Sequence, residues 1–415
     1  MDDEFRLSPC EYDEDELDRM PFKRKMIIIG IVGLAFVILL IFTISAVLRH
    51  FNRVVTEYTV EYSDNLFSSK SDNSVFKEQE NEALKKKVAF HFGNDRLMIS
   101  TIDGAYFIDG KGLMSGRYSY AINEPVGDFC NDSILVYDYE GTKAMVLIES
   151  KAGLMINSLR NILRGKVSGN GKTVLYSSDD RNDYVTVYNA QGEVENEIRT
   201  TFADGIPVDY AISDDGTRLV TAYCSYENNK IVSKLSFYNF AQKGYAVRSP
   251  LTGQETIEGK IITRVVFAGR ENIIAFNNNG FELYEMRTTK SKLLSKNFED
   301  ETVLDYAYDA THFGVVLKDM KTGKKRVVIY DYIGREIKSF NETAFSIDFS
   351  DEIHIALRGE QILLSNSKEL GLYTLEGKCK ALLKFEASVS NCAFAGEDRF
   401  FITSGDSIEI LKLKR

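Results

Sequence analysis

The segment GKVSGNGKT, from Gly165 to Thr173, contains the glycines and the lysine of a phosphate-binding loop. In that motif four residues separate the first glycine from the Gly-Lys pair, and a helix follows whose N-terminus holds phosphate. Here five residues separate Gly165 from Gly171, and the strand-like stretch TVLYSS follows. The pattern therefore favours a turn between two strands over a nucleotide site.

A second segment with chemical potential is SSDDRND, from Ser177 to Asp183, which groups Asp179, Asp180 and Asp183. Three carboxylates are suitable oxygen ligands for a hard cation such as Ca²⁺. The segment lacks both the ligand spacing of an EF-hand and its central glycine. We therefore favour a solvated hairpin loop and predict no metal site.

Histidines and nucleophiles show no catalytic arrangement. The four histidines, His50, His91, His312 and His354, are isolated, and neither HExxH nor GxSxG occurs. No separate α/β region is present to hold a hydrolase site. The sequence thus assigns no catalytic, cofactor-binding or metal-ligating residue, predicts no cofactor, and favours a protein that is not an enzyme, although acidic side chains from distant segments could still converge in the fold.

The five cysteines are scattered and show no CxxC or zinc-type spacing: Cys10, Cys130, Cys224, Cys379 and Cys392. Free cysteines usually behave as small buried apolar groups, which is the interpretation we favour. A Cys379–Cys392 bridge stays open as an alternative.

Composition limits the class of protein. The 415 residues include 44% hydrophobic residues, 22 Tyr and 26 Phe but only 5 Pro, which is sufficient for a large folded core. The formal net charge of -10, without a long basic face, argues against a nucleic-acid partner, because phosphate binding needs clustered Lys and Arg.

The run from Met26 to Leu48 contains no charged residue and is long enough to cross a hydrocarbon core of about 30 Å as a helix. It is longer than the apolar region of a signal peptide, roughly 7 to 15 residues. More basic residues precede the run than follow it closely: Arg6, Arg19, Lys23, Arg24 and Lys25 against Arg49 and Arg53. The positive-inside rule then predicts a single-pass membrane protein with a cytoplasmic N-terminus.

Past this span, the sequence repeats. Turn-like anchors recur in seven steps that average about 43 residues, the length of a four-stranded propeller blade. The anchors are Phe92-Gly93-Asn94-Asp95, Phe129-Cys130-Asn131-Asp132, Val167-Ser168-Gly169-Asn170, Ile212-Ser213-Asp214-Asp215, Phe267-Ala268-Gly269-Arg270, Tyr308-Asp309-Ala310-Thr311, Phe349-Ser350-Asp351 and Phe394-Ala395-Gly396-Glu397. No sustained helical periodicity follows residue 90, so we predict an all-β, eight-bladed propeller, with seven blades as the alternative.

A second repeated feature is a Tyr-x-x-x-Gly turn, which occurs as YNAQG from Tyr188, YDYIG from Tyr330 and YTLEG from Tyr373, and in related form as YDYEG from Tyr137. Glycine suits a tight hairpin because it adopts a positive φ at little cost. We expect the preceding tyrosine to pack between neighbouring blades.

The last repeat ends at Arg415 after only three strands, so another segment must close the ring. Residues Val54 to Ser63 alternate in the manner of a strand, and we predict that they supply the missing outer strand, because a closed ring leaves no exposed sheet edge. Only Arg49 to Arg53 would then separate the span from the propeller, a reach under about 20 Å.

The predicted organisation has four parts. They are an acidic cytoplasmic tail at 1–25, a transmembrane helix at 26–48, a juxtamembrane strand and linker at 49–87, and a β-propeller at 88–415. The acidic run Glu11 to Asp18 is typical of a solvated tail, with a cytoplasmic docking peptide as the alternative.

Two turns carry a family resemblance. ISDDGTRLVTAY, from Ile212 to Tyr223, resembles the S-x-D-G turn of WD40-like propellers, and DMKTGKKRVVIYD, from Asp319 to Asp331, is similar to the D-x-x-TGK turn of quinoprotein-like ones. With its tail, span and propeller, the whole chain resembles the membrane-anchored propeller proteins of clostridia-type Gram-positive bacteria. The resemblance implies fold and localisation but lends no activity. Because the chain has no Trp, the Trp-Asp pairs of WD40 repeats and the Trp of quinoprotein repeats are absent, and no quinone cofactor is expected.

Together these features predict a single-pass membrane protein whose extracytoplasmic propeller is a binding or scaffold module for an envelope protein or a cell-wall component. Loops presented on a rigid ring suit that role. The alternative is a small-molecule sensor or an enzyme with its site in the central channel, which would require polar and titratable residues of several blades to converge there.

Overall fold

The computed structural model describes residues 59–65, 89–93, 95–148, 153–179, 181–201, 204–241, 250–287, 289–404 and 407–414. All of them belong to one compact unit that runs from Glu57 to Arg415. The predicted tail and membrane span lie outside the described residues, as do His50 and Cys10. Within the described ranges, no helix has the length and apolar character needed to cross a membrane.

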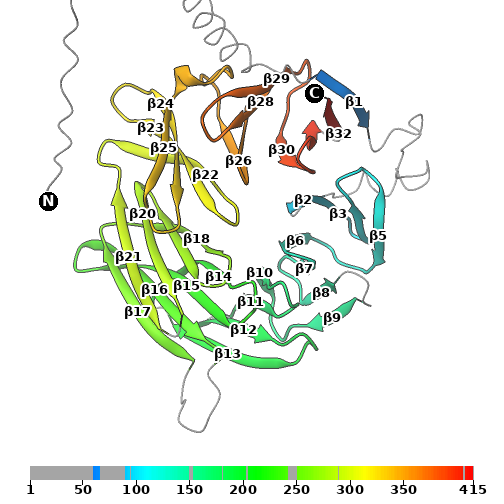
Figure 1. Ribbon diagram of the computed structural model, residues 1–415. Helices are drawn as coiled ribbons and strands as arrows, with labels where there is room; N and C mark the ends of the chain where they lie inside the picture. The colour runs from blue at the N-terminus through cyan, green and yellow to red at the C-terminus, as the bar shows by residue number, and fades with distance from the viewer. Residues whose placement is uncertain are drawn as a thin grey trace, which may run out of the picture. The chain divides into compact units, whose positions relative to one another are not determined.

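The described residues form eight antiparallel four-stranded sheets, which Figure 1 shows as blades around a common centre. Blades are numbered 1 to 8 along the chain. Blades 1 and 2 comprise β2 (Ala89–Gly93), β3 (Arg96–Ser100), β4 (Gly104–Ile108), β5 (Met114–Ser119), β6 (Pro125–Cys130), β7 (Ser133–Asp138), β8 (Lys143–Ile148) and β9 (Leu154–Asn157). Blades 3 and 4 comprise β10 (Ile162–Val167), β11 (Thr173–Ser178), β12 (Asn182–Tyr188), β13 (Val194–Thr201), β14 (Ile206–Ile212), β15 (Arg218–Glu227), β16 (Lys230–Asn239) and β17 (Leu251–Glu258).

The second half of the ring repeats this arrangement. Blades 5 and 6 comprise β18 (Ile262–Ala268), β19 (Asn272–Asn277), β20 (Gly280–Met286), β21 (Lys290–Asn297), β22 (Glu301–Tyr308), β23 (His312–Asp319), β24 (Lys325–Asp331) and β25 (Glu336–Asn341), followed by the short 3-10 helix η2 (Glu342–Ala344). Blades 7 and 8 comprise β26 (His354–Arg358), β27 (Gln361–Ser365), β28 (Glu369–Thr374), β29 (Cys379–Lys384), β30 (Asn391–Phe394), β31 (Arg399–Ser404), β32 (Ser407–Lys414) and β1 (Thr59–Asn65).

Burial along each blade explains why these sequences form strands. The middle strands are runs of β-branched and aromatic residues buried on both faces, as in SILVYD of β7 and the centre of β23. Outer strands such as β13 alternate between exposed and half-buried residues. Middle strands are sandwiched between neighbouring blades, whereas an outer strand meets solvent, so the two have different hydrophobic patterns.

The up-and-down order of the strands defines two faces of the ring. The loop face carries the hairpins between second and third strands and the connections from one blade to the next. The turn face carries the tight turns between first and second strands and between third and fourth strands. Each first strand is innermost and each fourth strand is outermost.

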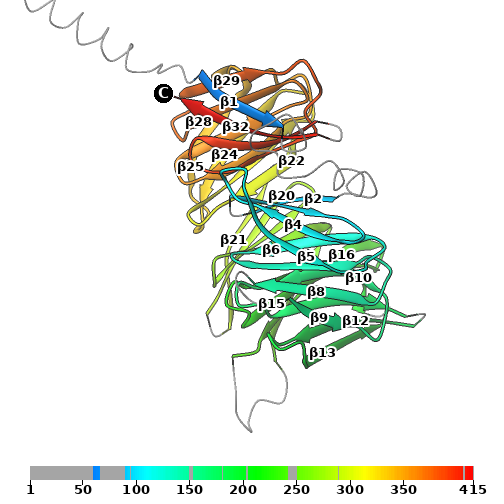
Figure 2. The same ribbon diagram turned by 90° about the vertical axis from the view of Figure 1, so that its right-hand side faces the viewer.

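The predicted closing strand is confirmed. β1 pairs antiparallel with β32 and is the outer strand of blade 8, and Figures 1 and 2 both show the two strands side by side next to the C-terminal end. The described strand covers Thr59–Asn65, while residues 54–58 of the predicted segment lie outside the described part of the chain. Thr59 is opposite Lys414, at the turn-face end of the blade.

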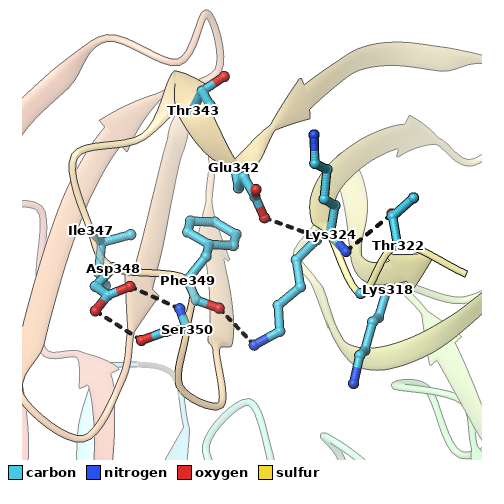
Figure 3. Close-up of a pocket in the computed structure, with 11 residues that line it drawn as sticks. Lys318, Thr322, Lys324, Glu342, Thr343, Ile347, Asp348, Phe349 and Ser350 are labelled. Carbon is cyan, nitrogen blue, oxygen red and sulfur yellow. Dashed lines mark hydrogen bonds between the residues drawn. The ribbon is translucent and has the colours of Figure 1, made fainter. Parts of the chain in front are cut away.

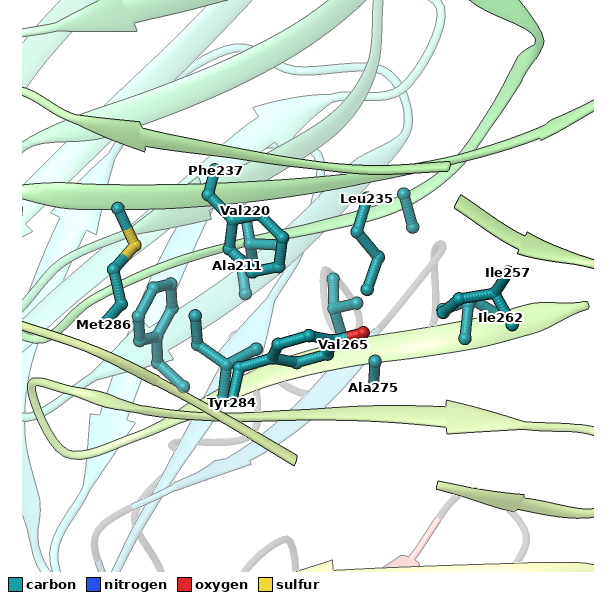
Figure 4. Close-up of a cluster of buried hydrophobic side chains, with 13 residues drawn as sticks. Ala211, Val220, Leu235, Phe237, Ile257, Ile262, Val265, Ala275, Tyr284 and Met286 are labelled. Carbon is teal, nitrogen blue, oxygen red and sulfur yellow. The ribbon is translucent and has the colours of Figure 1, made fainter. Parts of the chain in front are cut away.

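Hydrophobic side chains fill every junction between neighbouring blades. Each of eight buried clusters draws residues from two adjacent blades, and one of them joins Ile99 and Tyr106 of blade 1 to Phe401 and Ile410 of blade 8. Figure 4 shows the cluster between blades 4 and 5. Eight blades with eight filled junctions form a closed ring, which confirms the predicted all-β, eight-bladed propeller.

The repeated Tyr-x-x-x-Gly segment is the turn between third and fourth strands. The residue that follows the aromatic or aliphatic position is Asp, Asn or Thr. Its side chain accepts hydrogen bonds from two backbone N–H groups of the turn, as Asp331 does from Ile333 at 3.2 Å and Arg335 at 2.9 Å. The glycine three positions later has φ near +80°, a left-handed conformation that other residues rarely adopt. It occurs at Gly112, Gly192, Gly334 and Gly377.

The tyrosine of this turn packs between blades, as predicted. Tyr330 is buried, stacks on Phe313 of its own blade with centroids 5.2 Å apart, and meets Phe281 of blade 5 edge to face at 5.1 Å. Tyr188 and Tyr373 occupy equivalent places in other junctions.

Two sequence assignments need correction. Tyr137 ends a second strand, so the YDYEG segment is a hairpin of the loop face and not a turn between third and fourth strands. The anchor Phe349-Ser350-Asp351 precedes β26, whereas the first turn of blade 7 lies at Gly359, with φ +54°. Phe349 misled the prediction because it is a core aromatic of the connecting segment, packed against Phe345 with centroids 5.6 Å apart. The other seven anchors mark turns between first and second strands.

Candidate functional site

The two segments with apparent ligand chemistry are both structural. Ser168 to Lys172 form the turn between β10 and β11, as predicted for the segment that resembles a phosphate loop. Asp179 caps the hairpin between β11 and β12 by accepting the N–H groups of Arg181 and Asn182, and it accepts the Tyr184 hydroxyl at 2.8 Å. Asp183 accepts the Tyr176 hydroxyl at 2.7 Å. In the described ranges, no group of three His, Cys, Asp or Glu side chains is placed to hold a metal ion.

The cysteines of the propeller are all free. Cys379 and Cys392, for which a bridge stayed open, are in different blades and unbonded to each other, as are Cys130 and Cys224. Burial raises the pKa of the Cys379 thiol, and it raises that of the Cys392 thiol strongly. Protonated thiols of this kind are poor nucleophiles.

Charged side chains gather on the inner strands, where sequence reasoning assigned no site. In blades 2, 4 and 6 the first strand carries an aspartate followed by an aromatic and a small residue: Asp128-Phe129-Cys130, Asp209-Tyr210-Ala211 and Asp305-Tyr306-Ala307. In blades 3, 5 and 7 the first strand carries a basic residue followed by a β-branched one: Lys166-Val167, Arg264-Val265 and His354-Ile355.

Each of these aspartates connects its blade to the next one. Its Oδ2 accepts a backbone N–H from the first strand of the following blade, and it also pairs with the basic side chain one residue earlier on that strand. The N–H donors are Val167 at 3.0 Å, Val265 at 2.9 Å and Ile355 at 3.0 Å. The basic partners are Lys166 at 2.7 Å, Arg264 at 3.6 Å and His354 at 3.4 Å.

Asp209 is the most completely engaged of the three. Its side chain is 1% exposed, and besides Val265 and Arg264 it accepts Nη1 of Arg164 from blade 3 at 2.7 Å. The same Arg164 atom donates to the Val208 carbonyl at 2.7 Å. Asp209 therefore joins blades 3, 4 and 5.

β-bulges orient these side chains. The register of the first strand shifts immediately before Arg164, Asp209, Arg264 and Asp305. A bulge inserts one residue and re-aims the side chain that follows it. The carbonyl of Val208, the residue skipped in blade 4, is the one that Arg164 bonds.

Two further side chains of the inner strands, His91 and Tyr308, have shifted pKa values. Burial lowers the pKa of His91, on β2, to about 4, although the charge of Asp128 opposes the shift. Partial desolvation, together with the charge of Asp128, raises the pKa of Tyr308 on β22 to about 12, while Arg264 opposes the shift. At neutral pH both groups are uncharged.

Charged side chains of several blades are thus present on the inner strands, but their carboxylates are engaged in holding neighbouring blades together. A general acid or base needs free access to a substrate proton. The repeated Asp-aromatic-small tripeptide, spaced by about two blade lengths, is the sequence signal that identifies this network.

A separate hollow is open on the loop face between blades 6 and 7. The cavity has a volume of about 610 Å³. It lies between the hairpin that joins β23 to β24 and the connection from η2 to β26 (Figure 3). The hairpin contributes Lys318, Thr322, Gly323, Lys324 and Lys325, and the connection contributes Glu342, Thr343, Ile347, Asp348, Phe349 and Ser350.

Hydrogen bonds fix both walls of this cavity. Asp319 caps the hairpin by accepting the N–H groups of Lys321 and Thr322 at 2.9 and 2.7 Å. Lys325 fastens the hairpin to the connection, since its backbone N–H donates to Glu342 at 3.0 Å and its ammonium donates to the Phe349 carbonyl at 2.8 Å.

The loop face also carries the longest hairpin among the described residues, formed by the ten-residue strands β15 and β16. Its tip, Asn228-Asn229, has two consecutive left-handed residues, with φ of +49° and +63°. Ile206, Tyr226 and Ile231 share one side of this extension, because Ile206 is opposite Cys224 and Tyr226 is opposite Ile231. They are 67%, 71% and 38% exposed.

Comparison with known proteins places the chain in a family. Residues 66–413 match the sequence profile of DUF5711, described as a family of unknown function, and the chain belongs to that family. A comparison with curated proteins finds no significant sequence match.

Solved propeller structures are similar at low identity. The WD40 domain of Neurospora crassa Pan2 is 11% identical, with 86% of this chain and 95% of that chain covered and a TM-score of 0.42. Citrobacter koseri AztD is 10% identical, with 73% and 87% covered and a TM-score of 0.49. A quinoprotein alcohol dehydrogenase-like protein from Bacteroides thetaiotaomicron is 13% identical, with 62% and 66% covered and a TM-score of 0.37. At these values no function transfers to this chain.

Proposed function

We propose that this protein is a membrane-anchored binding module whose propeller engages an envelope protein outside the cell. The observation that carries the proposal is the apolar side of the blade 4 hairpin, formed by Ile206, Tyr226 and Ile231. An exposed apolar patch rimmed by polar residues is typical of a protein interaction site.

The hairpin patch continues a surface that is already used for packing. Ala222 and Leu235 lie further down the same side of β15 and β16, and both are buried in the junction with blade 5. Further along the same side, Tyr226 and Ile231 at the end of the hairpin and Ile206 at the start of β14 are exposed. A partner that supplies apolar side chains there would extend the junction.

Chain connectivity supports the use of the loop face. Thr59, the first residue of β1, lies at the turn-face end of blade 8. Ten residues, 49–58, separate it from the end of the predicted span, a reach of about 35 Å at most. Because the chain joins the propeller at the turn face, we assign partner binding to the loop face, which carries the hairpin and the cavity.

The test is in-cell photocrosslinking with the full-length chain. A photoreactive residue at Tyr226 is compared with one at Ile333, which is 69% exposed but lies in a turn of the opposite face. From position 226 we expect one specific protein adduct. The adduct should be lost when the same chain also carries Ile206→Ser and Ile231→Ser. The same adducts from both positions, or none from position 226, would contradict the proposal.

The proposed orientation has its own test. A cysteine introduced at Ser8 in the tail and another at Asn229 on the hairpin tip, each in a background without the native cysteines, are labelled in intact cells with a membrane-impermeant maleimide. We expect labelling at 229 and protection at 8 until the membrane is permeabilised. The opposite result would place the propeller inside the cell.

A further inference from the structure

The cavity on the loop face between blades 6 and 7 contains cations that are not neutralised within the propeller. In the described part of the chain, neither the ammonium of Lys318 nor that of Lys324 has an ion-pair or hydrogen-bond partner. Lys321, from the same hairpin, does not line the cavity and pairs instead with Asp300 at 2.8 Å. One hairpin thus contains a lysine that is paired and two lysines whose ammonium groups have no partner in the described chain.

The acidic groups that line the cavity already accept hydrogen bonds from the propeller, Glu342 from the opposite wall and Asp348 from its own wall. Glu342 accepts the backbone N–H of Lys325 at 3.0 Å. Asp348 accepts the N–H and the hydroxyl of Ser350, both at 2.9 Å, and these bonds lower the pKa of the Asp348 carboxyl. Both carboxylates retain lone pairs that can accept hydroxyl groups of a ligand.

The placement of the lysines indicates the form of the anion. Figure 3 shows Lys318 and Lys324 on the hairpin side of the cavity, with side chains that extend in opposite directions, and Asp348 and Ser350 on the other side. Because the two side chains extend apart, we expect each ammonium group to bind an anionic group of its own. No arginine lines the cavity, so the planar two-point recognition typical of carboxylates is missing, whereas lysine binds phosphate as a point charge.

From these observations we propose that the cavity binds a polyol phosphodiester with at least two phosphates. The phosphates bind Lys318 and Lys324, and the hydroxyl groups between them donate to Asp348 and Glu342. The cavity volume of about 610 Å³ is sufficient for a segment of this kind. The site is separate from the blade 4 hairpin, so this inference goes beyond the proposed protein-binding role and does not depend on it.

Two sources carry this chemistry, namely a soluble or wall-borne polyol phosphate polymer and the headgroups of anionic lipids. The experiment uses the purified full chain in a non-ionic detergent, with a synthetic tri(glycerol phosphate) as the probe in calorimetric titrations. Glycerol 3-phosphate is the single-phosphate comparison. A parallel flotation assay mixes vesicles of phosphatidylcholine, with and without phosphatidylglycerol, with the full chain already held in phosphatidylcholine nanodiscs.

The variant that tests the site is Lys318→Ala with Lys324→Ala, and the matched control is Lys321→Ala on the same hairpin. We expect saturable binding of the trimer, tighter than that of glycerol 3-phosphate, weakened about tenfold or more by the double change and about twofold or less by the control. Binding should also weaken as salt is raised.

Each outcome decides the matter. Loss of trimer binding in the double variant supports the site with a polymer source, and loss of vesicle binding in the double variant supports it with a lipid source. Absence of saturable binding to either probe, or equal loss in the double variant and in Lys321→Ala, overturns the inference. The protein crosslink at position 226 is unaffected by any of these results.

Discussion

Acidic and basic side chains meet in two regions of this propeller, the inner strands and the loop-face cavity, and the two regions use them differently. On the inner strands every aspartate of the repeated tripeptide accepts a backbone N–H and a basic side chain from the next blade. At the cavity the carboxylates accept hydrogen bonds from the backbone of the two walls, and two lysines have no partner in the described chain.

The comparison shows that the partners of a charged side chain, and not its residue type, decide whether the charge is structural or available to a ligand. Breaking a buried ion pair by removing one member leaves the other charge uncompensated, which is strongly destabilising. An exposed charge without a partner contributes little to stability and is available for binding. The following predictions test this contrast, from the largest expected effect to the smallest.

The largest effect is expected from the closing strand, because the inner network depends on a closed ring. Replacement of residues 59–65 by a Gly-Ser sequence of equal length removes the pairing with β32 and exposes a sheet edge. We expect the melting temperature to fall by more than about 10 °C. The same replacement at residues 70–76 is the control. An unchanged melting temperature after the first replacement would refute the closing role of β1.

Next in size is the Asp209→Ala change. It leaves Arg164 and Arg264 facing each other without their shared carboxylate and removes the acceptor of the Val265 N–H. We expect a loss of about 3 kcal/mol in the free energy of unfolding, measured by denaturant titration. Asp300→Ala, which breaks an exposed pair with Lys321, should change it far less. Equal losses in the two variants would remove the distinction between engaged and exposed charges.

A pH-dependent effect, at most about as large, is expected from His91. Its pKa is about 4 in the folded chain against 6.5 in the unfolded chain, so below pH 6.5 the unfolded state binds a proton that the folded state does not. Stability should therefore fall as pH falls from 6.5 towards 4, by up to about 3 kcal/mol, and His91→Gln should remove that part of the slope.

His354 provides a control of opposite sign. Its hydrogen bond to Asp305 raises its pKa, so its contribution to stability is complete below pH 6.5 and is lost as pH rises through the raised value. His354→Gln should therefore make the loss of stability on acidification steeper. The same change of slope in both variants would show that the two histidines do not differ as their surroundings indicate.

The smallest effect on stability is expected at the cavity. Lys318→Ala with Lys324→Ala removes two ammonium groups without a partner in the described chain, and we expect the free energy of unfolding to change by less than about 0.5 kcal/mol. Denaturant titration beside Asp209→Ala makes the comparison direct. A loss as large as that of Asp209→Ala would mean that the cavity lysines are structural.

Much of the ring could be predicted from the sequence because its repeats are local. The anchors and the Tyr-x-x-x-Gly turns depend on residues within a few positions of each other, such as Asp331 and Gly334. The prediction was wrong at Phe349, where an aromatic residue of the core has the same appearance as one beside a turn.

The inner network was missed although its tripeptides are visible in the sequence. Asp128 and Lys166 belong to different blades, and their pairing requires neighbouring first strands in register. The bulges before Asp209 and Arg264 shift that register by one residue, and no local pattern marks them.

By itself, the sequence determined the all-β class, the blade period and the closing strand, because hydrophobic alternation and turn chemistry act over short distances along the chain. Only the tertiary structure decided which charges are engaged. Asp209 is surrounded by three blades, and Lys318 and Lys324 line a cavity between two, because folding brings together segments that are distant in sequence. The energy of a charge depends on those neighbours and on its access to solvent, which the order of residues does not specify.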